Sequence, residues 1–66
     1  MEKHLYHFYI TSDFVYDPNQ QHLVLTHEEM VAKIVEIIKQ RRIRALYVSQ
    51  DAFPANIRIL TYHRGE

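Results

Sequence analysis

The chain has 66 residues, no cysteine, and eight basic and eight acidic residues, so its formal net charge at pH 7 is zero. This length encloses one core only, and the missing cysteine excludes disulfides, thiolate metal sites and a cysteine nucleophile. A neutral chain provides no overall field that attracts nucleic acid or a membrane surface. We therefore expect residues 1–66 to form a single cytoplasmic domain without membrane attachment.

The first third of the chain predicts a hairpin of two strands. Leu5 to Tyr16 is rich in alternating aromatic and β-branched residues, which is typical of one long strand that can bend near Ser12-Asp13. Asp17-Pro18-Asn19 has the residue types of a type I turn, because proline presets its φ angle and Asp and Asn suit the turn backbone. We therefore expect His22 to Leu25 to return as a short antiparallel strand.

The segment after residue 25 predicts one amphipathic helix. Thr26 and Glu29 have the spacing of a capping box, in which each side chain accepts a hydrogen bond from the other residue's backbone N–H. The apolar residues that gather on one side of this helix are Met30, Val31, Ile34, Val35, Ile37 and Ile38. Arg41 would fall within this stripe, where burying a charge is costly, so we expect the helix to end near Gln40 or Arg41.

The C-terminal part predicts a second hairpin. Ile43 to Ser49 alternates as a third strand, Gln50 to Asn56 contains Pro54 and indicates a loop, and Ile57 to Tyr62 alternates as a fourth strand. The predicted fold class is therefore α+β, with the order β-β-α-β-β and the helix packed on one face of a small antiparallel sheet. An alternative order, β-α-β-β, follows if Leu23 to Leu25 is a loop.

One helix covers one face of a sheet, so the other face is expected to lie uncovered. Strand alternation places several large side chains there, and aromatic residues that converge on one face are too apolar for an ordinary wet surface. Tyrosine buries a large area and keeps a polar hydroxyl, a combination that is typical of interface hot spots. The predicted partner-binding residues on this uncovered face are His7, Tyr9, Tyr47 and Tyr62.

A compact basic cluster lies at the end of the predicted helix and consists of Lys39, Arg41, Arg42 and Arg44. Such a cluster can contact successive phosphates and, together with tyrosines, bind single-stranded nucleic acid with an affinity that falls steeply with salt. The competing interpretation is solvated charge at a helix end. The zero net charge favours this second interpretation, because nucleic-acid-binding domains usually have a pI above about 9.

Motifs for catalysis or for cofactor binding are missing from the sequence. The five histidines lack the spacing of a zinc motif, the one glycine lies in the C-terminal tail, and no serine has the context of a hydrolase nucleophile. We therefore predict neither catalytic residues, nor a metal site, nor a cofactor. An enzyme whose active site forms between subunits stays as a third possibility, with His7 and Asp13 as the first residues to test.

These features lead by elimination to a functional hypothesis. We expect a small non-enzymatic regulatory or inhibitor-type protein that acts by protein–protein interaction through its uncovered, tyrosine-rich face. A homodimer is expected, because a chain this short forms only a marginal core by itself, and the other partner is expected to be a larger protein. The alternative is a nucleic-acid-binding regulator that uses the basic cluster.

Overall fold

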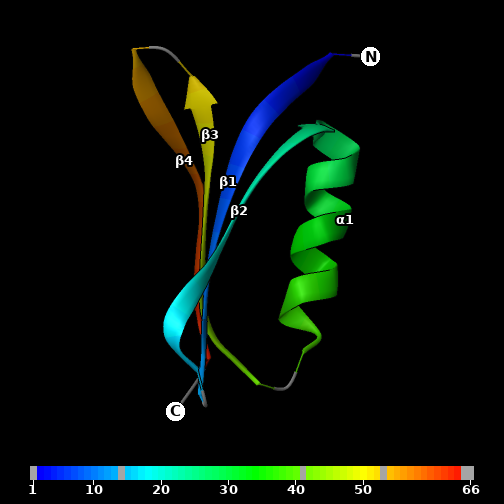
Figure 1. Cartoon of the computed structure of the whole chain (residues 1–66). Coiled ribbons are helices and arrows are strands. Elements are labelled where there is room, and N and C mark those ends of the chain that lie inside the picture. The colour runs from blue at the N-terminus through cyan, green and yellow to red at the C-terminus, as the bar shows by residue number, and fades with distance from the viewer. Residues whose placement is uncertain (1, 14, 41, 53, 65–66) are drawn as a thin grey trace.

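Four antiparallel strands form a sheet, and a helix packs against one of its faces (Figure 1). The computed structural model describes residues 2–13, 15–40, 42–52 and 54–64, with the backbone only for 15–17. Its elements are β1 (Lys3–Ser12), β2 (Val15–Thr26), α1 (His27–Ile38), β3 (Ile43–Ala52) and β4 (Ala55–His63). This arrangement confirms the predicted α+β class and the order β-β-α-β-β.

The strands lie in the order β2-β1-β3-β4, so β1 and β3 are central and β2 and β4 form the two edges. β1 pairs antiparallel with both β2 and β3, and β4 pairs antiparallel with β3. Because residues 23–25 pair with β1, the alternative that treats them as a loop is wrong. Within the described residues, no helix is long and apolar enough to cross a membrane.

The turn between the first two strands lies earlier in the chain than predicted. β1 ends at Ser12 and Asp13 lies in the turn, whereas the predicted turn, Asp17-Pro18-Asn19, belongs to β2. The β1–β2 register shifts between Ile10 and Ser12, so β2 carries extra residues in an irregular segment here. Pro18 fits this segment because an irregular stretch of an edge strand needs no ladder N–H from proline.

The capping box at the start of α1 is confirmed. The Thr26 hydroxyl accepts from the Glu29 backbone N–H at 3.2 Å, and the Glu29 carboxylate accepts from the Thr26 backbone N–H at 2.9 Å. The hydrogen bond from the Thr26 backbone, followed by the contact with its side chain, holds the pKa of Glu29 below its usual value. Two residues close in sequence thus set where the helix begins.

α1 ends at Ile38, before the predicted end near Gln40 or Arg41. Lys39 is its C-cap, and the backbone N–H of Gln40 bonds to the carbonyl of Ile37, an i to i−3 bond that closes the chain more tightly than an α-helix does. Arg41 lies outside the described residues. The chain therefore leaves the helix through a tightened turn, earlier than the charge pattern indicates.

The core lies between α1 and the sheet face that this helix covers. Strand alternation points Phe8 of β1 and Leu46 and Val48 of β3 toward the helix, where each is fully buried. Met30 of α1 completes this centre. Burying a side chain of this size contributes about 1.5–3 kcal/mol, so these four residues supply a large share of the free energy that favours folding.

The buried stripe of α1 is narrower than predicted. Met30 and Ile37 are buried, and Ile34 packs partly against the core. Val31 and Val35 are 44% and 46% exposed, because a helix lying on a sheet contacts it along one narrow side. That side contacts β1, β2 and β3, and no described Cα atom of α1 lies within 8 Å of one in β4.

The second hairpin has longer strands and a shorter connection than predicted. β3 extends to Ala52 and β4 begins at Ala55, so most of the predicted loop at 50–56 is strand. Pro54 lies in the turn, where its missing N–H costs no ladder hydrogen bond. The proline therefore marks a tight connection, and not the long loop that its presence suggested.

Candidate functional site

The sheet face opposite α1 is uncovered by the helix and is called the open face from here on. Because Phe8 is buried beneath α1, its neighbours on β1, His7 and Tyr9, point to the opposite side of the sheet. Antiparallel pairing places Tyr47 of β3 opposite Tyr9 and places His22 of β2 opposite His7, and directly opposite residues share a face. The predicted placement of His7, Tyr9 and Tyr47 on the uncovered face is confirmed.

Aromatic rings on the open face contact one another across the sheet. His7 and His22 stack with ring centroids 4.3 Å apart and planes inclined by 7°. Tyr47 meets Tyr9 edge-on at 5.8 Å between centroids and meets His63 of β4 edge-on at 5.5 Å. Aromatic pairs of this kind contribute about 0.5–1.5 kcal/mol beyond the area that they bury, so they hold these side chains in defined positions.

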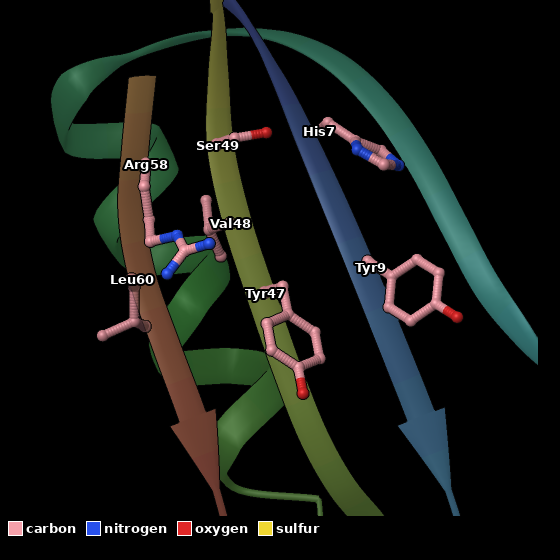
Figure 2. A pocket seen from close by; sticks show the side chains of 7 residues that line it. All are labelled: His7, Tyr9, Tyr47, Val48, Ser49, Arg58 and Leu60. Carbon is pink, nitrogen blue, oxygen red and sulfur yellow. The ribbon is translucent and has the colours of Figure 1, made fainter. Parts of the chain in front are cut away.

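A pocket of about 350 Å³ opens on this face between the rings and β4 (Figure 2). Its lining residues are His7, Tyr9, Tyr47, Val48, Ser49, Arg58 and Leu60. Arg58 pairs with Ser49 across the β3–β4 ladder, and Figure 2 shows its guanidinium pointing toward β3. Among the described residues, the guanidinium of Arg58 has no hydrogen-bond or ion-pair partner. The pocket therefore combines aromatic walls, a serine hydroxyl and an unpaired cation.

Tyr62 lies on the helix side of the sheet, contrary to prediction. The β3–β4 register shifts by one residue at Ile59, so two residues of β4 stand where regular pairing needs one. A slip of one residue moves every following side chain to the other face. Arg58 therefore stays on the open face, while Leu60 and Tyr62 pack against the core, with Leu60 also bordering the pocket. The placement of Tyr62 on the uncovered face was wrong.

The open face also contains three residues that the sequence analysis does not predict there, namely His22, Arg58 and His63. His22 and His63 join it through strand pairings that no local pattern reveals. Arg58 had one available signal, because it is a lone charge between the apolar residues Ile57 and Ile59. A charge at such a position in a strand indicates a side chain that points away from the core.

The histidines of the open face contact polar neighbours, and within the described residues no three His, Asp or Glu side chains could hold a metal ion together. His7 donates from Nε2 to the side-chain oxygen of Gln20 at 3.3 Å, and Nε2 of His22 lies 4.0 Å from the Asp51 carboxylate.

His7 and Asp13, the two residues considered for an enzyme between subunits, are kept apart by β1. His7 lies near the middle of this strand, whereas Asp13 follows its end.

A bidentate ion pair ties the turn after β1 to the end of β4. The Arg64 guanidinium donates to both carboxylate oxygens of Asp13, at 2.6 and 2.9 Å. The backbone N–H of Asp13 bonds to the Arg42 carbonyl, and that of Arg64 bonds to the Arg44 carbonyl. The hydrogen bond from Arg64, together with the charges of Arg64 and Arg44, holds the pKa of Asp13 below its ordinary value of 3.8.

We expect Asp13→Asn to lower the stability near neutral pH. Because folding lowers the pKa of Asp13, the contribution of the ion pair is fully present above the ordinary value of 3.8 and is lost as the pH falls through the lowered value. Thermal unfolding of the wild type and Asp13→Asn should therefore differ at neutral pH and converge as the pH falls through the lowered pKa of Asp13. The pair is accessible to solvent, so high salt should reduce the difference. A difference that persists in acid would contradict this assignment.

The predicted basic cluster includes an acidic neighbour in the structure. Lys39, Arg42 and Arg44 are exposed, and Arg41 lies outside the described residues. The Asp13 carboxylate lies near enough to Arg44 for their charges to attract each other. The described part of the cluster is therefore not a uniformly positive surface, and nucleic-acid binding through it stays a prediction from the sequence.

Fold and site together define a small α+β domain with one covered and one open sheet face. Comparison of the chain with protein-family models, curated proteins and solved structures gave no significant match. Function is therefore inferred from the chemistry of the open face.

Proposed function

We propose that this protein is a small non-enzymatic regulatory or inhibitor-type protein that binds a larger protein through its open face. The pocket carries this proposal, because the exposed ring of Tyr47 and the unpaired guanidinium of Arg58 lie on either side of it. Tyrosine and arginine are enriched at interface hot spots, where each buries a large area and keeps polar groups. Leu60, which is partly buried, adds apolar surface to the same pocket.

The size of the pocket suits one side chain of a partner. Its volume of about 350 Å³ is near the lower limit of the roughly 300–1,000 Å³ that small-molecule sites occupy. Tyr9, Tyr47 and His63 extend an aromatic surface beside it, against which neighbouring residues of the partner can pack. A protein surface that inserts one anchor residue uses both features.

Arg58 favours an acidic anchor on the partner. A guanidinium forms strong, often bidentate hydrogen bonds to a carboxylate, and these bonds strengthen where water is partly excluded. The Ser49 hydroxyl beside Arg58 can donate a further hydrogen bond to the same group. We therefore expect the partner to place Asp or Glu in the pocket and an apolar or aromatic residue against Tyr47.

Selection from a random peptide library displayed on phage tests the proposal with a defined probe. The wild type should enrich peptides in which Asp or Glu lies close to an aromatic residue. Tyr47→Ser should abolish this enrichment because it removes one wall of the pocket, while the circular dichroism spectrum should stay unchanged. Peptides that bind the wild type and Tyr47→Ser equally well, or a selection that enriches no peptide, would contradict the proposal.

Charge reversal tests the acidic anchor separately. Arg58→Glu should move the selection from acidic toward basic peptides, because the pocket then presents a carboxylate. Lys39→Glu makes the same change of charge at the end of α1, away from the open face, and should leave the selected peptides unchanged. Enrichment that depends on Tyr47 but ignores Arg58→Glu would keep the open face as the binding surface and remove the acidic anchor.

We also propose that the protein acts as a homodimer. A chain of this length buries only about 60% of the surface that its unfolded form exposes, so association is a common way to complete the core. The core leaves apolar side chains exposed on β4, the strand whose Cα atoms all lie more than 8 Å from those of α1, namely Ile57 and Ile59.

A further inference from the structure

The two edges of the sheet differ in how they are protected against pairing with another strand. An edge strand presents unpaired backbone N–H and C=O groups, which can bind a strand of another chain. β2 carries Pro18, which lacks an N–H, within a segment whose register with β1 is irregular. Both features are devices that block strand addition, so β2 is a protected edge.

β4 has weaker protection. It runs for nine residues without proline, and Arg58 is its one Lys, Arg, Asp or Glu residue. Ile57 and Ile59 are 51% and 37% exposed along it. No Cα atom of α1 lies within 8 Å of one in this strand, and Figure 1 shows the β3–β4 hairpin projecting away from the helix. The β-bulge at Ile59 is itself one protective device, but it leaves a strand segment on either side of it.

We propose that β4 pairs antiparallel with β4 of a second copy of this chain, which joins two four-stranded sheets into one. This pairing satisfies the backbone groups of both edges and covers part of the exposed surface of Ile57 and Ile59. A two-fold axis makes the contact self-complementary. The joined sheet then ends at two β2 strands, where Pro18 opposes further addition, so the assembly closes as a dimer.

This pairing places the open faces of both copies on the same side of the joined sheet. The two-fold axis between antiparallel edge strands is perpendicular to the sheet, so both helices lie on one side and both open faces lie on the other. Arg58 is on β4 itself, and therefore each copy places its pocket beside the seam. A partner with two acidic anchors could bind both pockets and gain avidity. The pairing rests on the proposed homodimer, to which it gives an interface, but not on the proposed binding of a larger protein, which uses the open face.

The mass of the protein in solution, measured by light scattering during gel filtration over a range of concentrations, tests the pairing. The wild type should have twice the mass of one chain. Ile57→Lys combined with Ile59→Lys should give a folded monomer, because both side chains are exposed and like charges across the seam repel. Leu5→Lys combined with Val24→Lys is the matched control, since this exposed pair lies on the open face toward the β2 edge, and it should stay dimeric.

Each other outcome of this experiment overturns the inference. A wild type that is monomeric at all concentrations shows that the edge is not used by a second copy. A dimer that survives the two lysines on β4 shows that another surface is responsible. If only Leu5→Lys with Val24→Lys dissociates the dimer, the open faces pack against each other.

Single cysteines provide an independent readout, because the natural chain has none. Ile57→Cys, Ile59→Cys and Thr61→Cys, each introduced alone and oxidised, sample positions along β4. Residues directly opposite across strands have Cβ atoms about 4.5–5.5 Å apart, so the position that crosslinks best identifies the register. Val24→Cys on β2 should not crosslink. Crosslinking through Val24→Cys, with none at the β4 positions, would overturn the pairing.

Discussion

Replacing Phe8 with alanine is expected to abolish cooperative folding at room temperature. Phe8 is fully buried between α1 and the sheet, where it packs with Leu46 and Val48. Removing such a side chain costs about 3–5 kcal/mol through lost burial and the cavity that remains. A single core in so short a chain rarely supplies more than about 3–5 kcal/mol. Urea unfolding followed by far-ultraviolet circular dichroism should therefore show no cooperative transition.

Leu5→Ala is the matched control for this prediction. Leu5 lies on the same strand as Phe8 but on the open face, where it is 39% exposed. Exposed substitutions away from special features usually change stability by less than about 0.5 kcal/mol, so the unfolding midpoint should hardly move. If Phe8→Ala kept the wild-type unfolding midpoint and Leu5→Ala showed no cooperative transition, the assignment of the two faces of β1 would be reversed.

Ile37→Asp is expected to be comparably disruptive. Ile37 lies in the C-terminal half of α1 and is 2% exposed. An unpaired carboxylate at this position costs several kcal/mol or must take up a proton. Ile34, the centre of the predicted stripe, packs only partly against the core, so the same change there should cost less. Unfolding by urea and by heat, compared with the wild type, measures the difference.

Val35→Asp provides the control on the other side of the helix. Val35 lies two residues before Ile37 and is 46% exposed. Its replacement also puts a carboxylate in place of a branched apolar side chain. The Val35→Asp protein should stay folded, with a loss of stability that reflects helix propensity alone. A folded Ile37→Asp protein beside an unfolded Val35→Asp protein would show that α1 presents its opposite side to the sheet.

Local patterns predicted the parts of this fold that depend on residues close in sequence. The capping box of Thr26 and Glu29 places the start of α1 correctly, because both partners lie within one helical turn. Alternation along β1 assigns Phe8 to the core and His7 and Tyr9 to the open face, because the pleat has a period of two. These predictions required no knowledge of which strands pair.

The two prolines are misleading in the sequence, because the meaning of a proline depends on its position in the sheet. Pro18 suggested a turn, yet it lies in an irregular segment of an edge strand, where no ladder N–H is needed. Pro54 suggested a long loop, yet it lies in a short connection between two strands. In both cases the hydrogen bonds required from the backbone decided the outcome, and these depend on neighbouring strands.

Periodicity and capping act over a few residues, so the amino-acid pattern is enough to predict the fold class, the start of the helix and the face on which Tyr9 and Tyr47 lie. The other residues of the open face are selected by strand pairing, which depends on contacts between residues distant in sequence. One extra residue at Ile59 shifts the β3–β4 register. This shift places Tyr62 on the core side of the sheet and keeps Arg58 on the open face. Pairing between two strands selects that register, and no pattern within β4 alone encodes it.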